Sequence, residues 1–540
     1  MASIQNNPGA IAYDFLGHLS TYEQFGKDID QCARGLANLG VQPGDRVTIS
    51  MLTTPHVLTA VYAVNKLGAV STIIHPYVVP KQVENYLQIS KSKFVLTLNA
   101  FYGNFTRLSK ITSPEASIVV KIEDYLDRKQ RRKFRREKGH KIPKLPLDLG
   151  IYNWSALMYK SFPNPAPVAV GADDLAVILY SGGVSGFPKG ILLSNRNINA
   201  QGMQFAAWSG IHLRSSMLNL MPFSSAYGLS TCHAMLGAGG KCILVPWFTP
   251  PIIAKLIIRK HPSHLVGIPG LFSNLNQNLT FLKSYLGFLK SALSGTISLP
   301  IFIKLRFEEI VRKNGGNIQL LDSYGLTETS GPICASPHGD YRGGAVGIPF
   351  PDNYVKIVQL ESEPPQEVNW GQDGEICVHG PTVMIGYLDK PEETARVLRV
   401  HEDGLLWLHT GDIGTMDEDG FIYFKSRIKR VIERAGNTIY LSEIEDILNK
   451  NPEIRESAVI SIPDEQLGQK IKSFIVLKNQ AKSNARKARE IISYCRERLT
   501  PWSCPEEIEF LPFLPRTIHS GELLYSGLES RSPRKAPPTT

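Results

Sequence analysis

Helical segments and short apolar segments alternate through about the first 360 residues, and this alternation restricts the fold more than any other feature of the sequence. Residues 21–39 carry apolar side chains at the spacing of an amphipathic helix, and residues 46–50 form a short apolar strand after it. Residues 56–67 and 69–74 repeat the same order. Strands that alternate with helices in this way are typical of an α/β fold with largely parallel sheets.

The pattern changes further along the chain and predicts its division into domains. Residues 361–428 are first polar and turn-rich and then form short alternating strands, which predicts a β-rich subdomain at the end of a large N-terminal domain, residues 1–428. Residues 429–529 carry a second set of helices and strands, enough for a small α+β C-terminal domain. The tail, residues 530–540, is rich in Pro, Ser and Arg and is predicted to be disordered.

Composition excludes several classes of protein. The chain has 540 residues, of which 43% are hydrophobic and 20% charged, as in ordinary globular proteins with more than one domain. No apolar run reaches about 18 residues, and the N-terminus lacks the basic-then-apolar order of a signal peptide, so we predict a cytoplasmic protein without a transmembrane segment. The seven cysteines form no C-x-x-C pair, which favours reduced, buried thiols over a disulfide framework or a zinc site.

The net charge of +10 comes from one segment. Residues 128–144 contain ten Lys or Arg and one Glu, and the remainder of the chain is nearly neutral. No helix-turn-helix, zinc-finger or RNA-binding signature accompanies the run, so no nucleic-acid partner is predicted. We predict a solvated basic surface helix; an anionic membrane surface, the phosphates of a cofactor and an acidic partner are the alternatives.

A loop rich in glycine and hydroxyl side chains follows the apolar strand 175–180. Its residues are Ser181, Gly182, Gly183, Val184, Ser185, Gly186, Phe187, Pro188, Lys189 and Gly190. The backbone N–H groups of such a loop bind phosphate, but the residues that flank the lysine are not those of a Walker A loop. The loop resembles the phosphate loop of the superfamily that contains acyl-CoA synthetases, luciferases and nonribosomal-peptide adenylation domains, Tyr-Thr-Ser-Gly-Thr-Thr-Gly-x-Pro-Lys-Gly.

The resemblance extends from about residue 21 to about residue 528, with the later motifs in the family's order. It implies a large N-terminal domain of layered sheets and helices followed by a mobile α+β C-terminal domain. It also implies that the chain handles an acyl-adenylate, whose AMP moiety derives from ATP, and transfers the acyl group to coenzyme A.

The segment 322–328 matches the family's Tyr-Gly-x-Thr-Glu motif and gives the most specific part of the resemblance. It implies that Asp322 and Tyr324 contact the nucleotide, with the Tyr324 ring stacked on adenine. Thr327 holds the α-phosphate, and the Glu328 carboxylate binds Mg²⁺ beside the pyrophosphate oxygens. Thr327 and Glu328 are therefore predicted catalytic residues, and Glu328 the metal ligand.

Four further residues complete the implied nucleotide and thiol sites. The family's Thr-Gly-Asp motif places Asp412 on the ribose hydroxyls, and Arg427 is implied to reach the same ribose. Lys429 matches the hinge between the domains, around which relatives change from adenylate formation to thioester formation. Gly436 matches a glycine that lines the pantetheine tunnel, where a missing side chain admits a thin thiol arm.

Residues 221–229 resemble the family's acyl-pocket segment and imply that Phe223, Ser225 and Tyr227 line the acyl pocket. Gly295 lies in a segment that resembles the lining of both the adenine and the acyl cavities. Ser225 stands where many relatives have His, so the family does not identify the acyl group. Fatty, aryl, terpenoid and polyketide-derived acids all remain open.

The family's C-terminal catalytic lysine is replaced by Glu522, and no lysine occurs between Lys487 and Lys535. Reversing a unit charge about 4 Å from developing negative charge costs up to roughly 8 kcal/mol at an effective dielectric constant of about 20. Losing the donor alone costs about 100- to 1000-fold in rate. Gly182 and Val184 also replace two hydroxyl residues of the phosphate loop.

These changes predict an acyl-CoA ligase that transfers the acyl group of an acyl-adenylate to coenzyme A, with weak or absent ATP-dependent adenylation. A separate adenylating enzyme is then the partner that supplies the acyl-adenylate. The alternatives are an ordinary two-step ligase that uses ATP and Mg²⁺, a ligase whose acceptor is a carrier protein, and a non-catalytic adenylate-binding pseudoenzyme.

Overall fold

The computed structural model describes most of the chain. It covers residues 2–106, 108, 112–137, 150–181, 188–247, 250–295, 299–360, 362–434, 437–464, 468–480, 483–517 and 523–531. These residues form two compact units. The first comprises the described residues up to 181, together with 188–354 and 379–398; the second comprises 355–378 and the residues from 399 onward. The domain boundary at residues 428 and 429 stays a prediction.

The first unit contains two large sheets. In the described residues, the first sheet has the strand order β16 (Ile348–Pro349), β15 (Gly331–Ala335), β14 (Leu320–Leu326), β13 (Ser291–Ser294), β12 (His264–Gly267), β10 (Ser216–Asn219), β11 (Lys241–Leu244), β1 (Ile11–Phe15), β2 (His18–Thr21). The second has the order β19 (Gly386–Tyr387), β9 (Lys189–Ser194), β8 (Leu175–Ser181), β4 (Val70–Ile73), β3 (Arg46–Ser50), β5 (Phe94–Leu98), β6 (Ala116–Val120), β7 (Ile151–Asn153).

Both sheets are parallel except at their edges. From β14 to β1 the neighbouring strands of the first sheet pair in parallel, and β15, β16 and β2 pair antiparallel. In the second sheet the strands from β8 to β7 pair in parallel, and β9 and β19 pair antiparallel. The predicted α/β fold with largely parallel sheets is confirmed.

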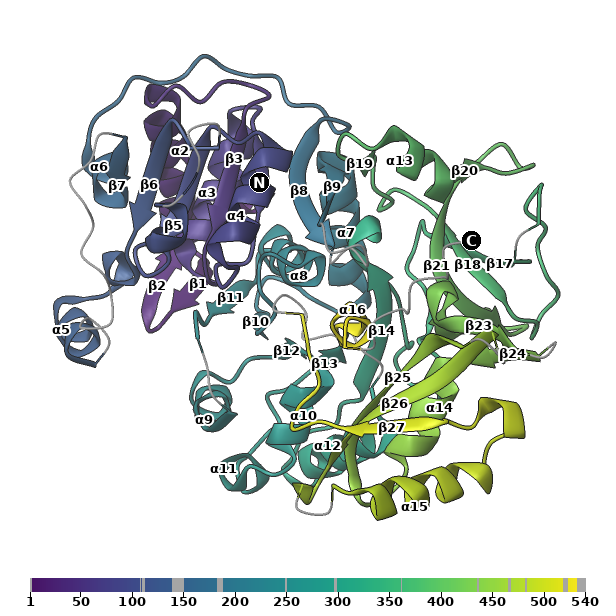
Figure 1. Ribbon diagram of the computed structural model, residues 1–540. Helices are drawn as coiled ribbons and strands as arrows, with labels where there is room; N and C mark the ends of the chain where they lie inside the picture. Colours follow the sequence, from purple (N-terminus) through teal and green to yellow (C-terminus); the bar gives the residue numbers. More distant parts are fainter. Residues whose placement is uncertain are drawn as a thin grey trace. The chain divides into compact units, whose positions relative to one another are not determined.

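Helices pack on both sheets of the first unit (Figure 1). They are α1 (Ala2–Asn6), α2 (Tyr22–Asn38), α3 (Pro55–Lys66), α4 (Pro80–Ser90), α5 (Arg128–Glu137), α6 (Trp154–Tyr159), α7 (Asn195–Trp208), α8 (Ala226–Gly237), α9 (Pro250–Lys260), α10 (Pro269–Leu275), α11 (Leu279–Leu282), α12 (Ile301–Lys313) and α13 (Pro391–Val397). Helix α8 packs on β10 and β11, and its neighbour α7 packs on β8 and β9, so this helix pair joins the two sheets.

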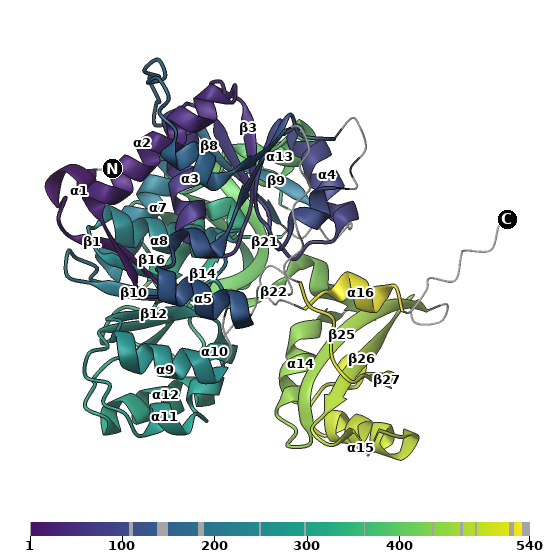
Figure 2. The ribbon, with the colours of Figure 1, turned by 90° about the vertical axis from the view of Figure 1, so that its left-hand side faces the viewer.

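Apolar side chains from α9, α10 and α12 form a core with the strands β10 to β14. Phe272 and Phe307 pack edge to face at its centre and are fully buried. Figures 1 and 2 both show α9 to α12 gathered along this part of the first sheet. One face of these strands is thus filled by apolar side chains, and α/β sheets bind ligands at the carboxyl ends of their strands.

The second unit begins with a sheet in the order β17 (Tyr354–Val358), β18 (Gly374–His379), β21 (Leu406–Met416) and β20 (Leu398–Val400), with β22 (Ile422–Arg427) also paired to β21. The hairpin β23 (Val431–Arg434) and β24 (Asn437–Tyr440) follows. A last sheet contains β25 (Ile454–Asp464), β26 (Gly468–Leu477) and β27 (Glu507–Phe510). Helices α14 (Leu441–Asn449) and α15 (Ala485–Arg496) share a core with one face of this sheet, and α16 (Tyr525–Glu529) packs on the other face.

The structure bears on the predictions for the basic run, the cysteines and transmembrane segments. Helix α5 carries the first part of the basic run, with Arg132 and Lys133 exposed; residues 138–144 lie outside the described residues. All seven cysteines are buried thiols. Among the described residues, no helix is both long and apolar enough to cross a membrane.

His264, on β12, is a buried histidine whose charge couples folding to pH. Its Nε2 lies 3.0 Å from the Ser209 carbonyl oxygen and its Nδ1 lies 2.8 Å from the Ser263 hydroxyl. Burial lowers its pKa to about 4. The unfolded state therefore binds more protons than the native state between that value and about 6.5, and stability falls as the pH is lowered through this window.

We expect this residue to lower the free energy of unfolding by up to about 2 kcal/mol between pH 6.5 and pH 5. The His264→Gln variant keeps a side-chain N–H donor and should lose that part of the pH dependence. Urea unfolding of both proteins across this pH range measures the difference. If the free energy of unfolding depended on pH in the same way for both proteins, His264 would not be a source of the pH dependence.

Candidate functional site

The segment that follows β14 makes a sharp turn at the carboxyl end of the first sheet. Strand β14 runs into the short 3₁₀ helix η4 (Thr327–Thr329), and the Leu326 N–H donates to the Thr329 hydroxyl at 2.8 Å. Ser330 adopts a left-handed backbone conformation with φ of 61°, and its hydroxyl donates to the Thr382 carbonyl at 2.9 Å. These contacts fix Thr327 and Glu328 at a strand end, where α/β sheets bind ligands.

Glycine at position 325 is required by close backbone packing. A Cβ atom there would lie 2.1 Å from the Gly331 carbonyl oxygen on β15, closer than non-bonded atoms approach. The register between β14 and β15 also shifts at this point, between Tyr324 and Gly325. The glycine of the Tyr-Gly-x-Thr-Glu motif is therefore a packing requirement that lets β14 turn.

Glu328 is half-buried and accepts a hydrogen bond from Tyr387, whose Oη lies 3.0 Å from its Oε1. Burial, together with the charge of Glu328, raises the pKa of Tyr387, so its hydroxyl stays a donor. The Met384 N–H donates to the Glu328 carbonyl at 2.8 Å. The segment around β19 thus orients Glu328 through both side chain and backbone.

Lys189 joins this cluster from β9. Its Nζ pairs with Glu393 on α13 and lies 4.8 Å from the centre of the Tyr387 ring. The hydrogen bonds from Lys189 and Lys390 lower the pKa of Glu393 to about 2, so the carboxylate is ionised. Two predicted site residues, Lys189 and Glu328, are therefore brought together through Tyr387. The loop residues Gly182, Gly183, Val184, Ser185 and Gly186 lie outside the described residues, as does the side chain of Ser181.

Tyr227, on α8, contacts Ser323 of β14 and packs against Gly295, the residue that follows β13. The Tyr227 Oη lies 3.2 Å from the Ser323 Oγ, and a Cβ at position 295 would lie 2.8 Å from the Tyr227 Cζ. Phe223 is fully buried nearby in the chain. The Ser225 hydroxyl caps α8, donating to the Pro222 carbonyl at 2.8 Å and accepting from the Gly228 N–H at 3.1 Å.

Asp322 and Tyr324 lie on β14. The Asp322 carboxylate accepts hydrogen bonds from the N–H groups of Leu299, at 3.2 Å, and Ser323, at 3.0 Å. Burial outweighs these bonds and raises the pKa of Asp322 to about 6. Tyr324 is buried and pairs in register with Cys334 of β15.

In the second unit, Asp412 and Arg427 face each other across β21 and β22. They are in register, and the Arg427 Nε lies 3.2 Å from Oδ1 of Asp412. Gly411 has a φ of 71° and donates its N–H to Glu375 at 2.8 Å, while the Thr410 hydroxyl donates to the Ile376 carbonyl at 2.7 Å. Hydrogen bonds to two residues of β18 thus hold the backbone turn that precedes Asp412.

The remaining predicted site residues are not described. The backbone of Lys429 lies in the 3₁₀ helix η5 (Ile428–Arg430), but its side chain falls outside the described part of the chain. Gly436 and Glu522 also lie outside it. Their implied roles stay predictions.

Sequence reasoning missed Tyr387 and Glu393. The local sequence around Tyr387, Gly386-Tyr387-Leu388, carries no motif that connects it with the segment 322–328. A short antiparallel pairing of β19 with β9 places it there. Only the folded arrangement of these strands gives that information.

Comparisons with known proteins agree with the motifs. The family model for AMP-binding enzymes matches residues 2–388, and that for the AMP-binding enzyme C-terminal domain matches residues 443–520. A long-chain-fatty-acid–CoA ligase of Bacillus subtilis strain 168 is 31% identical over 522 residues, which cover 94% of this chain and 90% of that protein. A feruloyl-CoA synthase of Amycolatopsis sp. is 26% identical, with 97% and 96% covered.

The fold is shared with solved structures at low sequence identity. ATP-bound MatB from Rhodopseudomonas palustris superposes with a TM-score of 0.82 at 23% identity, covering 97% of this chain and 96% of that one. An anthranilate CoA ligase in complex with anthranoyl-AMP gives a TM-score of 0.80 at 22% identity.

Gly325→Ala tests the turn that positions Thr327 and Glu328. The added Cβ would overlap the Gly331 carbonyl, so β14 and β15 must separate, and we expect a loss of about 1–3 kcal/mol in the free energy of unfolding. Gly343→Ala is the matched control, because a Cβ at that exposed position meets no atom within 4 Å. Denaturant unfolding measures the free energy of unfolding of both variants. Equal stability of the two variants would contradict the packing requirement.

Proposed function

Because the chain belongs to the AMP-binding enzyme family, we propose that it is an acid–thiol ligase that joins a carboxylic acid to coenzyme A through an acyl-adenylate. The observation that carries the proposal is the cluster in which Glu328, Tyr387 and Lys189 meet at the carboxyl end of the first unit's strands. An acidic, a hydroxyl and a basic group in contact provide what a metal-bound triphosphate requires.

The proposed reaction has two steps. The acid's carboxylate attacks the α-phosphorus of ATP, which forms the acyl-adenylate and releases pyrophosphate. The coenzyme A thiol then attacks the acyl carbonyl, loses its proton and releases AMP. Thr327 would hold the α-phosphate, Lys189 and the loop 181–186 the outer phosphates, and Tyr324 and Asp322 the adenine.

Glu328 fits the role of Mg²⁺ ligand. Tyr387 engages its Oε1, which leaves Oε2 for a cation, and hard cations prefer carboxylate oxygen. The ion would neutralise charge that develops on the phosphate oxygens. In the second unit, Asp412 and Arg427 would contact the ribose, Lys429 would act as the hinge, and Gly436 would line the path of the thiol.

For the acyl group we propose an apolar monocarboxylic acid. The Bacillus relative is named for long-chain fatty acids and the Amycolatopsis relative for ferulic acid, so an aliphatic chain and an aryl ring are the two candidates. Phe223, Tyr227 and Gly295 are the residues we propose for the pocket wall, with Ser225 fixing the start of α8 beneath them.

A second candidate function is favoured by one sequence feature, Glu522, which we infer to stand at the position of the family's catalytic lysine. Under this proposal the chain performs the thiol-transfer step and a separate adenylating enzyme supplies the acyl-adenylate. The ordinary two-step ligase is preferred because relatives named as a CoA ligase and a CoA synthase match the chain over nearly its whole length. The cytoplasm stays the proposed location.

The two candidates differ in their response to free acids. We expect purified protein with ATP, Mg²⁺ and coenzyme A to convert fatty or aryl acids to acyl-CoA, detected by mass spectrometry. Preformed acyl-adenylates, supplied in parallel without ATP, should give the same products. Product from the adenylates alone would overturn the two-step proposal in favour of thiol transfer, and adenylate binding without any thioester would indicate a non-catalytic adenylate-binding protein.

The Glu522→Lys variant measures how much that position limits adenylation. Restoring a positive donor should raise the rate of acid-dependent pyrophosphate exchange by about 100- to 1000-fold if Glu522 faces the reacting phosphate. Glu529→Lys makes the same charge change at an exposed position on α16 and is the matched control. Equal rates for the wild type and both variants would show that Glu522 does not limit adenylation.

Tyr387→Phe tests the orientation of Glu328. The variant keeps the ring under Lys189 but removes the hydroxyl that donates to the carboxylate, and a hydrogen bond to a charged group contributes about 1.5–3 kcal/mol. We expect kcat/KM for Mg·ATP to fall about 10- to 100-fold, with a higher Mg²⁺ requirement. Tyr285→Phe, at an exposed tyrosine, is the control. An unchanged Mg²⁺ requirement in Tyr387→Phe would remove Tyr387 from the metal site.

A further inference from the structure

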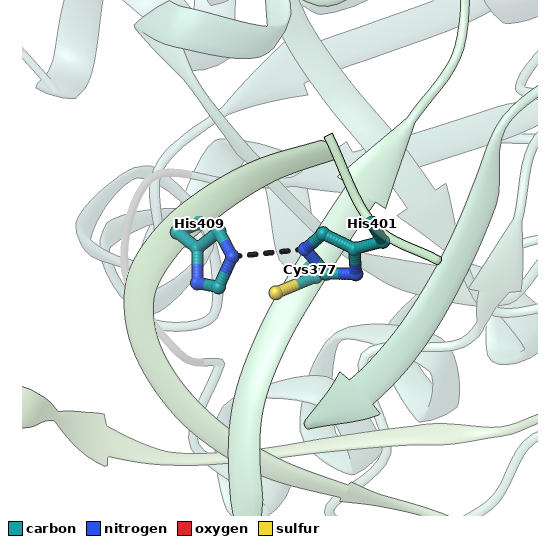
Figure 3. Close-up of side chains that lie close together, drawn as sticks. All are labelled: Cys377, His401 and His409. Atoms are coloured by element: carbon teal, nitrogen blue, oxygen red, sulfur yellow. Dashed lines mark hydrogen bonds between the residues drawn. The ribbon is translucent and has the colours of Figure 1, made fainter. Parts of the chain in front are cut away.

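Three side chains of metal-ligating types, none of them assigned to the proposed reaction, converge in the second unit (Figure 3). Cys377 comes from β18, His409 from β21, and His401 from the turn between β20 and β21. One ligand atom from each residue lies within 4.8 Å of the other two. All three side chains are buried, with exposed fractions of 0%, 8% and 5%.

His409 is oriented by a carboxylate. Its Nδ1 lies 2.7 Å from Oε2 of Glu375, and the other oxygen of that carboxylate accepts the Gly411 N–H. This contact turns Nε2 of His409 toward the cluster, as in Figure 3. A histidine that donates one ring N–H to a carboxylate and offers the other nitrogen is the arrangement in which protein histidines bind metals.

His401 is held by the turn that precedes β21. The backbone N–H of His401 donates to the Leu405 carbonyl at 3.1 Å, and its backbone carbonyl accepts a hydrogen bond from the Gly404 N–H at 2.9 Å. Its ring stacks on Trp407 with 5.7 Å between ring centres, and its Nε2 lies 3.0 Å from Nε2 of His409. Nδ1 of His401 is buried and has no hydrogen-bond partner in the described part of the chain.

We propose that Cys377, His401 and His409 bind a divalent transition-metal ion, with Glu375 as the residue that orients His409. Zinc is the expected ion because thiolate and imidazole are its preferred ligands. The proposal differs from the expectation drawn from cysteine spacing, which argued against a zinc site, because two of the three ligands are histidines. It does not depend on the proposed function.

The geometry allows the ion after small movements. Bond lengths of about 2.3 Å to sulfur and about 2.0–2.1 Å to nitrogen place the ligand atoms of a tetrahedral zinc site about 3.4–3.6 Å apart. The two Nε2 atoms therefore separate slightly, and the thiol moves inward. A water molecule would take the fourth position.

Charge also balances at the site. Binding converts the Cys377 thiol to a thiolate and releases its proton, so one thiolate and the Glu375 carboxylate compensate the two positive charges of the ion. A buried ion requires such compensation.

The same side chains also have a metal-free explanation. One imidazole N–H can donate to the other ring at the observed Nε2 separation, and Cys377 packs against Val358 and Trp407 as a core residue. Free Cys is among the most buried residue types. The experiment must therefore separate an ion from a hydrogen bond between the two rings.

Metal content of the full-length, untagged wild-type chain gives the first result. We expect about one zinc per chain by elemental analysis after dialysis against trace zinc. Replacement by Co²⁺ should give visible d–d absorption together with near-ultraviolet thiolate-to-cobalt charge transfer. The charge-transfer band identifies Cys377 when Cys377→Ser abolishes it and Cys334→Ser, a buried cysteine of the first unit, retains it.

Variants and chelation supply the second result. His401→Leu should lose the bound zinc, and Glu375→Gln should weaken zinc binding about 10- to 100-fold. A chelator should lower the unfolding temperature of the wild type but not that of His401→Leu. Absence of bound zinc and of a chelator effect in the wild type would overturn the proposal in favour of the hydrogen-bonded histidine pair. Zinc retained by both Cys377→Ser and His401→Leu would overturn it in favour of a different site.

Discussion

The close approach of β14 to β15 at Gly325 is the constraint on which the first unit's part of the candidate site depends. A Cβ atom at position 325 would lie 2.1 Å from the Gly331 carbonyl oxygen, so there is no room for a side chain where β14 leads into η4. The turn then presents Thr327 and Glu328 at the end of a strand whose other face is filled by the α9–α12 core. A rigid scaffold with functional groups at its edge follows from this packing.

The elements and motifs of the site were accessible from sequence, whereas its side-chain contacts were not. Apolar periodicity located segments such as β3 and α2 because local spacing records which face is buried. The glycine and carboxylate of the segment 322–328 were recognisable because the segment matches the family's Tyr-Gly-x-Thr-Glu motif. Tyr387 and Glu393 reach the site only through the pairing of β19 with β9, and one sequence holds no local record of that pairing. Counting cysteines missed His401 and His409 for the same reason.

The charges around Lys189 bear on the proposal that Glu522 occupies the position of the family's catalytic lysine. A cation that replaces that lysine must leave its present partner, and Lys189 is already paired with an ionised Glu393 while its ammonium lies over the Tyr387 ring. Moving it would leave Glu393 with Lys390 alone and would take the positive charge away from the proposed phosphate loop. Lys189 could therefore replace the catalytic lysine only at the cost of these interactions. The proposed adenylation step therefore depends on which positive group would face the α-phosphate.

Strand β21 connects the second unit's proposed metal ligands with Asp412, its proposed ribose-binding residue. His409 and Asp412 lie on the same strand, and Glu375 of β18 contacts the backbone between them through the Gly411 N–H while also holding the His409 ring. Asp412 is buried and paired with Arg427, so its orientation depends on how firmly β21 is held against β18 and β22. An ion, or a hydrogen bond between the rings of His401 and His409, adds a further restraint on β21. The two restraints differ. An ion bound by Cys377 and His409 would tie β18 to β21, whereas the contact between the histidine rings ties β21 only to the turn that precedes it.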